Sequence, residues 1–138
     1  MNEPRGPFTG GCQCGAVRYV LEGSIFGLSV CHCHDCQRQS GSAFGMSLII
    51  SPEALELTSD SLKTFEVTTD SGRTKTCAFC RECGVRICNR TDTRVSIKAG
   101  TLDDVSWLEP RAHFWVSRKQ PWVQIPNDVK CYEFDGDA

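Results

Sequence analysis

Three cysteines lie close together in segment 31–36, which has the sequence Cys-His-Cys-His-Asp-Cys. Cys31, Cys33 and Cys36 are separated by two and then by three residues, so a turning backbone can bring their sulfurs to one point. Zinc accepts thiolates at about 2.3 Å in a tetrahedron. Three thiols in so short a segment cannot all pair with one another as disulfides. We therefore interpret the segment as a metal site.

The fourth ligand decides which kind of zinc centre this is. A structural zinc is closed by four protein ligands, whereas a catalytic zinc keeps three and leaves one position for water or substrate. His34, His113 and Cys77 are the alternatives for a closing ligand. His32 lies between two ligands and is expected to point away. We favour the open, three-thiolate site and keep closure by one of these residues as the alternative.

Two distant cysteine pairs have the spacing of a closed site. Cys12 and Cys14 are flanked by glycines, which let the backbone bend around a metal. Cys80 and Cys83, followed by Gly84, have the zinc-knuckle pattern. A site made from both pairs ties the fold together, because the free energy of metal binding becomes free energy of folding. We predict a structural zinc on these four cysteines.

The other cysteines are interpreted as buried thiols. Cys77 also lies three residues before Cys80, but on a regular strand the two side chains point to opposite faces. We favour a buried thiol there over a ligand, since free cysteine is among the most buried residue types. Cys88 and Cys131 have no neighbour at ligand spacing and receive the same interpretation.

Length and composition restrict the class of protein. A chain of 138 residues is expected to form one domain, and a formal net charge of −2 argues against a general nucleic-acid binder. No apolar run is long enough to span a membrane, and the first residues have no signal-peptide pattern. The expected location is the cytoplasm, where metal explains ten cysteines better than disulfides do.

Short strands are expected to position the cysteines. Residues 16–22 alternate, with Val17, Tyr19 and Leu21 on one face, as in a half-buried strand. Further strands are predicted over 25–30, 43–50, 55–58, 62–67, 73–79, 85–89, 95–99 and 111–117. A short helical turn is expected within 37–42, a single turn at 100–104, a loose lead-in over 1–8 and an extended segment over 121–126. The fold class is therefore mainly β.

Taken together, the motifs resemble the glutathione-dependent formaldehyde-activating enzyme family, whose domain is shared with centromere protein V. The resemblance covers about residues 8–133. Any one motif would be weak, but their common order is a strong pattern. The motifs are Gly-Cys-Gln-Cys-Gly at 11–15, the segment 31–36, Gly-Ser-Ala-Phe at 41–44, Phe-Cys-Arg-Glu-Cys-Gly at 79–84, Ala-Gly-Thr-Leu-Asp-Asp at 99–104, His-Phe-Trp-Val at 113–116 and Pro-Trp at 121–122.

This resemblance implies a single zinc-binding domain over residues 1–138, a β-tent of small antiparallel sheets around a structural zinc. It implies two Zn²⁺ per chain. The structural zinc would lie on Cys12, Cys14, Cys80 and Cys83, and a catalytic-type zinc on Cys31, Cys33 and Cys36. The implied activity is of carbon–sulfur lyase type, the condensation of glutathione with formaldehyde to S-(hydroxymethyl)glutathione and its reverse.

A zinc with three thiolates is formally at −1, which suits a substrate thiol better than the activation of water. We expect a small-molecule thiol such as glutathione as the partner, with no nucleic acid and no membrane. Arg38, Arg118 and Lys119 are weighed as cations for its carboxylates against the simpler interpretation of surface charge. His113 is weighed as a proton shuttle against a structural histidine, and no general base is assigned.

Two other functions stay open at this point. One is a non-catalytic binding or scaffold domain in which both zincs are structural. The other is a zinc hydrolase that uses bound water, which the all-thiolate ligands disfavour. A fourth protein ligand such as His34 would favour the scaffold, whereas an open second site favours the lyase.

Overall fold

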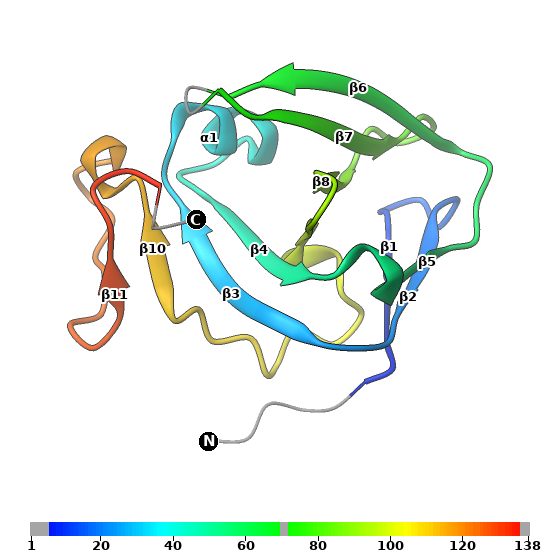
Figure 1. Cartoon of the computed structure of the whole chain (residues 1–138), viewed down its shortest axis with the longest axis horizontal. Coiled ribbons are helices and arrows are strands. Elements are labelled where there is room, and N and C mark those ends of the chain that lie inside the picture. The colour runs from blue at the N-terminus through cyan, green and yellow to red at the C-terminus, as the bar shows by residue number, and fades with distance from the viewer. Residues whose placement is uncertain (1–5, 70–71, 136–138) are drawn as a thin grey trace.

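Residues 6–69 and 72–135 are described in a computed structural model of the chain. They form two sheets, with one α-helix and three short 3-10 helices between the strands (Figure 1). The mainly β class predicted from the sequence is confirmed. None of the helices in this part of the chain is long and apolar enough to cross a membrane.

The smaller sheet has three antiparallel strands in the order β1–β2–β5. Their bounds are Phe8–Gly11, Arg18–Leu21 and Leu55–Leu57. The alternation predicted for β2 is confirmed, because Val17, Tyr19 and Leu21 are buried while Arg18 is exposed. Phe8 begins β1 and stacks on Trp107 with ring centroids 5.0 Å apart, so the predicted loose lead-in ends before it.

The larger sheet has eight strands in the order β11–β10–β3–β4–β9–β8–β7–β6. It curls so that β3 and β4 lie on one side and the β6–β7 hairpin on the other, with α1 between their ends (Figure 1). The bounds are Ile25–Cys31 for β3, Gly45–Ile50 for β4, Leu62–Thr68 for β6, Thr74–Cys80 for β7, Arg86–Arg90 for β8, Val95–Lys98 for β9, Ala112–Phe114 for β10 and Lys130–Cys131 for β11.

Most of these pairings are antiparallel, but β10 pairs in parallel with both β3 and β11. The strand predicted over 111–117 is shorter than expected. It ends at Phe114 because Trp115 takes the left-handed conformation, with φ 55°, and a 3-10 helix follows over Val116–Arg118. The predicted turn at 100–104 appears as a 3-10 helix one residue earlier, over Ala99–Thr101. The third 3-10 helix, Pro52–Ala54, lies between β4 and β5.

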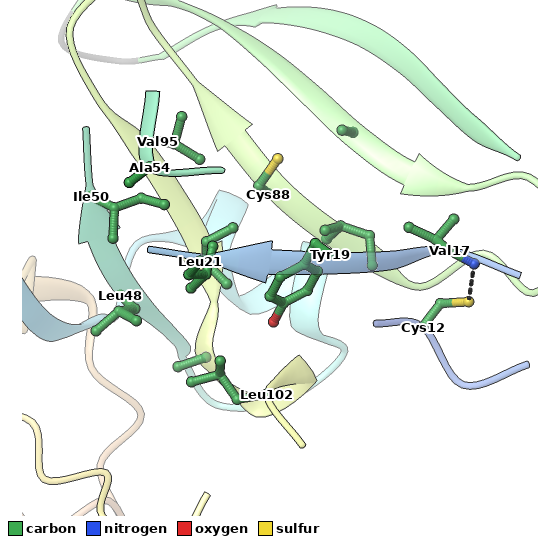
Figure 2. Close-up of a cluster of buried hydrophobic side chains, with 14 of the residues drawn as sticks. Cys12, Val17, Tyr19, Leu21, Leu48, Ile50, Ala54, Cys88, Val95 and Leu102 are labelled. Carbon is green, nitrogen blue, oxygen red and sulfur yellow. Dashed lines mark hydrogen bonds between the residues drawn. The ribbon is translucent and has the colours of Figure 1, made fainter. Parts of the chain in front are cut away.

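The core fills the space between the two sheets (Figure 2). Tyr19 lies at its centre, fully buried, and its hydroxyl is 2.7 Å from Thr101 Oγ1. Gly10 is required here, since a methyl group at that position would lie 2.3 Å from the Tyr19 hydroxyl. Each large apolar side chain that is fully buried contributes about 1.5–3 kcal/mol. The core therefore holds the two sheets together beside the cysteines.

Helix α1 spans His34–Ser40 and begins before the predicted turn. Cys33 caps its N-terminus, because the Cys33 sulfur accepts a hydrogen bond from the Cys36 amide at 3.3 Å. The helix ends at Gly41, whose φ of 63° is in the left-handed region that favours glycine. Two of the three cysteines of segment 31–36 thus belong to the first turn of a helix.

Candidate metal centres

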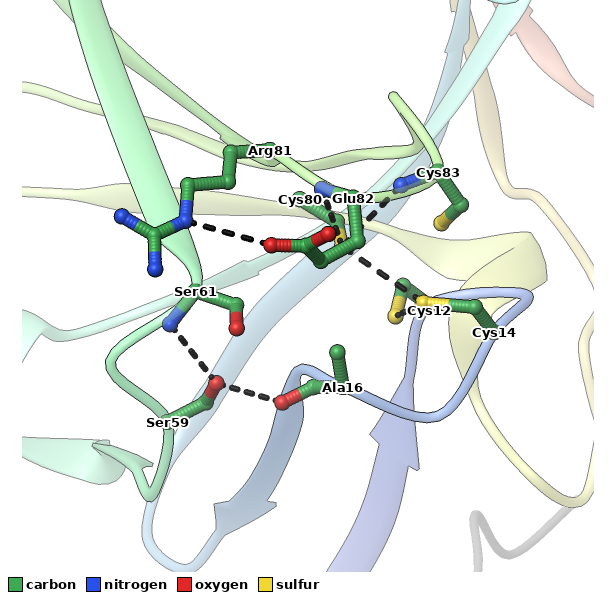
Figure 3. A network of polar contacts seen from close by, with 9 residues as sticks. All are labelled: Cys12, Cys14, Ala16, Ser59, Ser61, Cys80, Arg81, Glu82 and Cys83. Carbon is green, nitrogen blue, oxygen red and sulfur yellow. Dashed lines mark hydrogen bonds and ion pairs between the residues drawn. The ribbon is translucent and has the colours of Figure 1, made fainter.

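The first candidate centre consists of Cys12, Cys14, Cys80 and Cys83, whose sulfurs all lie within 4.8 Å of one another (Figure 3). Cys12 and Cys14 lie in the turn between β1 and β2 of the smaller sheet. Cys80 ends β7, and Cys83 lies in the turn before β8 of the larger sheet. The structure therefore brings together the two pairs that the spacing predicts, one from each sheet.

Backbone amides surround these four sulfurs. The Val17 amide donates to Cys12 Sγ at 3.2 Å (Figure 2), and the Glu82 and Cys83 amides donate to Cys80 Sγ at 3.3 and 3.5 Å (Figure 3). Backbone hydrogen bonds from Val85 and Cys14 lower the pKa of Cys83 to about 6. Four soft donors with amides directed at them fit a thiolate-bound divalent metal of zinc type.

The second candidate centre consists of Cys31, Cys33 and Cys36, which also have sulfurs within 4.8 Å of one another. Cys31 is the last residue of β3, and the other two belong to the start of α1. Gln39, one turn further along the helix, directs its amide Nε2 at Cys36 Sγ at 3.8 Å. The three sulfurs of the predicted site are therefore brought together by a single corner between a strand and a helix.

The hydrogen bonds among these three thiols are unequal. Cys31 and Cys36 donate to Cys33, which lowers the pKa of Cys33 to about 2. The same hydrogen bonds raise the pKa of Cys31, because its donated proton is retained. Of the three, the Cys33 thiolate is therefore the one that its neighbours stabilise most. A set of soft, preformed donors with one stabilised thiolate fits a soft divalent metal.

None of the three candidates for a closing ligand joins this group within the described part of the chain. His34 is exposed at the start of α1, and Cys77 is buried in β7. His113 Nδ1 lies 2.8 Å from His32 Nε2, so the ring is held by another imidazole. His32 is fully buried and faces His113, consistent with the expectation that it points away from the cysteines.

An open cleft of about 680 Å³ is lined by residues of α1, of the loop that follows it and of segment 120–122. Trp122 at its rim is 69% exposed, and its indole Nε1 donates to Gln120 Oε1 at 2.7 Å. Gln120 in turn donates to Gln37 Oε1 at 3.0 Å, which connects this rim to the helix. The lining residues are His34, Gln37, Arg38, Gly41, Ser42, Ala43, Gln120 and Trp122.

The three cations predicted for substrate carboxylates have different surroundings. Arg38 lines the cleft. The Arg118 guanidinium lies 4.5 Å from the centroid of the Trp115 ring. Lys119 Nζ donates to the Val123 carbonyl at 2.8 Å. Arg38 is thus the one of the three that lines the cleft, and it belongs to the same helix as Cys36.

The remaining cysteines belong to neither centre. Cys77 and Cys88 are each 1% exposed, so their assignment as buried thiols is confirmed. The same assignment is wrong for Cys131, which is exposed. Cys131 lies in the two-residue strand β11, which pairs with β10 at the edge of the larger sheet in the described part of the chain, and an edge strand leaves a side chain more exposed than a central strand does.

Two features of the site were not predicted from the sequence: a polar network between α1 and β8, and a buried lysine. Gln39 Oε1 accepts hydrogen bonds from Arg86 Nη1 at 3.0 Å and from Asn89 Nδ2 at 2.9 Å. Lys98, at the end of β9, is only 9% exposed and lies near Cys36. No spacing rule relates these residues, because they come from separate strands and a helix.

A family model described as "glutathione-dependent formaldehyde-activating enzyme" matches residues 7–118. That range includes all seven cysteines of the two candidate centres. No curated protein matches the chain. A crystal structure of a protein from Rhodobacter sphaeroides, a structural-genomics target, superposes with a TM-score of 0.57 at 20% sequence identity. It covers 71% of this chain and 90% of the other, and at this identity the likeness concerns the fold.

Proposed function

The chain belongs to the glutathione-dependent formaldehyde-activating enzyme family, and from this premise we propose that it is a zinc-dependent enzyme of carbon–sulfur lyase type. Its substrate would be the adduct of a small-molecule thiol, such as glutathione, with an aldehyde such as formaldehyde. The observation that carries the proposal is the incomplete second centre. Three sulfurs converge at the start of α1, other residues of this helix line an open cleft, and none of the described residues supplies a fourth ligand.

The two centres have different roles in this proposal. Cys12, Cys14, Cys80 and Cys83 would hold a structural zinc between the sheets. Cys31, Cys33 and Cys36 would hold the second. Zinc bound there supplies a soft Lewis acid at which a substrate thiol loses its proton.

The chain's own residues would position the substrate. Arg38 presents a guanidinium at the cleft, the group that matches a carboxylate. The Trp122 indole offers an exposed apolar face at the same rim. A thiol that carries carboxylates, as glutathione does, has the chemistry that these two groups would bind.

Zinc content per chain tests the two-centre assignment. We expect two zincs in the wild type and about one in Cys33→Ser, which should remain folded because the four-cysteine centre is intact. Cys131→Ser, an exposed cysteine outside both centres, is the matched control and should keep both zincs. Unfolding of Cys33→Ser would instead identify the second zinc as structural and favour the scaffold alternative.

Exchange spectroscopy by NMR tests the activity. The zinc-loaded wild type should accelerate the exchange between glutathione with formaldehyde and S-(hydroxymethyl)glutathione, and Cys33→Ser should not. Arg38→Ala should raise KM more than it lowers kcat, because the guanidinium binds carboxylates remote from the reacting carbon. A wild-type rate no higher than that of buffer would rule out this pair of substrates.

A further inference from the structure

Lys98 is a buried cation without a carboxylate partner in the described part of the chain. Its side chain is only 9% exposed, and its ammonium donates to Ser47 Oγ at 3.4 Å. The ion pairs of this part of the chain, Arg18–Asp103 and Arg81–Glu82, do not involve it. A charged group is buried at high cost unless an opposite charge lies near it. An anion near Lys98 is therefore needed to compensate the positive charge of its ammonium.

The groups that face the Lys98 ammonium are the sulfurs of the second centre. A methyl group at Gly45 would lie 2.9 Å from Lys98 Nζ and 3.6 Å from Cys36 Sγ, so the two atoms flank the same glycine of β4. Burial lowers the pKa of Lys98, while Cys36 and Cys31 act in the opposite direction. The geometry thus places the ammonium beside Cys36, and Cys31 is the second sulfur that acts on it.

Arg86 and Lys75 are the other cations near Lys98, and as like charges they lower its pKa further. Arg86 is already hydrogen-bonded to Gln39 and Asn89 and lies 5.0 Å from the centroid of the Phe65 ring. Of the groups that act on Lys98, Arg86 and Lys75 are positive, and the sulfurs of Cys36 and Cys31 have the opposite charge when deprotonated.

We propose that Lys98 is the resident counter-cation of the three-cysteine centre and raises its affinity for a divalent metal. Three thiolates and one divalent ion leave a formal charge of −1, which one ammonium neutralises. Lys98 acts through the sulfurs and is a positioning residue. The inference rests on the metal centre of the proposed function but not on its substrate.

The two centres differ in the groups that stabilise the negative charge of their sulfurs. Around the four cysteines, backbone amides of Val17, Glu82 and Cys83 donate to sulfur. Around the three cysteines, the backbone amides of Cys36 and Asp35 donate to Cys33, and the Gln39 side chain donates to Cys36 Sγ. The two sulfurs of this centre that act on Lys98 are therefore those of Cys36 and Cys31, to which no backbone amide donates among the described hydrogen bonds. Their negative charge needs compensation from another group, and Lys98 supplies it.

Competition between the protein and a zinc chelator tests the proposal, because the first centre serves as an internal reference. Lys98→Met keeps the length of the side chain and removes the charge. We expect zinc affinity at the second centre to fall about 10–100-fold, as for other outer-shell partners, with affinity at the first centre unchanged. Lys98→Arg should keep most of the affinity. Lys63→Met, at an exposed lysine of β6, should change neither centre.

Wild-type affinity in Lys98→Met would overturn the proposal. An equal loss in Lys98→Met and Lys98→Arg would also overturn it, because packing rather than charge would then be the cause. If Lys98→Met also lost the metal of the first centre, as misfolding would cause, Lys98→Gln would take its place in the same comparison. A wild type that binds one zinc would refute the proposed function and with it the premise of this inference.

Discussion

At the second centre, Lys98 and Cys36 pack against Gly45 so closely that there is no room for a methyl group on this glycine. Gly45 has ordinary strand geometry, so an alanine there meets no backbone strain, only the Lys98 ammonium and Cys36. At Gly27, in the neighbouring strand β3, an added methyl group would have no atom within 4 Å. The two glycines therefore separate a local steric effect from the general effect of replacing glycine in a strand.

Gly45→Ala should reduce the free energy of unfolding by about 1–3 kcal/mol, the usual cost of overpacking. Gly27→Ala should be neutral or slightly stabilising, since alanine restricts the unfolded chain more than glycine does. Urea denaturation of the zinc-loaded variants measures both. Equal stability of the two variants would show that the contacts of Gly45 with Lys98 and Cys36 do not constrain the strand.

The buried pair of His32 and His113 gives stability a dependence on pH. Their nitrogens lie 2.8 Å apart and their rings are stacked at 5.1 Å. Burial lowers the pKa of His113 below its usual value of about 6.5. Between the lowered value and 6.5 the unfolded chain binds more protons than the folded chain does. The unfolding free energy must therefore rise with pH in that window and fall on acidification.

His113→Gln removes the titrating ring and keeps an amide that can pair with His32. As the pH falls from about 7 to 5.5, the wild type should lose more stability than the variant, by up to about 1.4 kcal/mol per pH unit for one proton. Zinc release affects both proteins, so the difference between them isolates His113. Parallel stability curves of the two proteins against pH would contradict the role assigned to the imidazole.

Helix α1 is attached to the sheet by a polar contact rather than by apolar packing, as none of its residues is buried. Gln39 accepts from Arg86 and Asn89 of β8, while Gln37 Nε2 donates to the His32 carbonyl at 2.8 Å and to the Arg118 carbonyl at 3.1 Å. Two cysteines of the second centre belong to this short element. Its attachment therefore determines where their sulfurs lie.

Gln39→Ala should cost about 1–3 kcal/mol of unfolding free energy, because it leaves two donors, one of them on the buried Asn89, without their acceptor. Ser40→Ala, in the next helical position, removes an exposed hydroxyl that donates to the Gln37 carbonyl, and should change stability by less than about 0.5 kcal/mol. Chemical denaturation at saturating zinc compares the two. A Gln39→Ala chain as stable as Ser40→Ala would show that the network contributes nothing to stability.

At the scale of the whole molecule, the four-cysteine centre connects the two sheets. Cys12 and Cys14 follow β1 of the smaller sheet, while Cys80 ends β7 of the larger sheet and Cys83 lies in the turn before β8. Structural zinc in small domains binds with about 10–16 kcal/mol, as much as the total stability of a typical domain. If this centre holds a structural zinc as proposed, removal of the zinc is expected to unfold the chain.

Cys83→Ser should be unfolded or melt far below the wild type, whereas Cys33→Ser should melt close to it. A chelator strong enough to remove all zinc should abolish the far-UV circular dichroism of the sheets in the wild type. Thermal melts with and without chelator measure the effect, and Cys131→Ser serves as the control for loss of a thiol. Retention of the sheet signal and of Tm after complete zinc removal would show that the core alone maintains the fold.

The parts of the structure that could be predicted are those encoded by local spacing. Alternation identified the buried face of β2, and cysteine spacing identified both sulfur clusters. The parallel pairing of β10 with β3 joins residues 112–114 to 29–31, and no local pattern encodes so distant a partner. Lys98 ends a strand like any surface lysine, and its surroundings come from β4 and α1. The start of α1 escaped prediction because a cysteine, rather than a common capping residue, caps it.

The two clusters differ in how much of the polypeptide must exist before each set of sulfurs is complete. All ligands of the three-cysteine centre exist once residue 36 has been synthesised, whereas those of the four-cysteine centre are complete only at residue 83. Closing the longer loop also costs more chain entropy. During synthesis, the three-cysteine centre can thus bind an ion before Cys80 and Cys83 of the four-cysteine centre have been added to the chain. If both centres bind zinc as proposed, scarce zinc would load the three-cysteine centre first, although the fold would depend more on the four-cysteine centre.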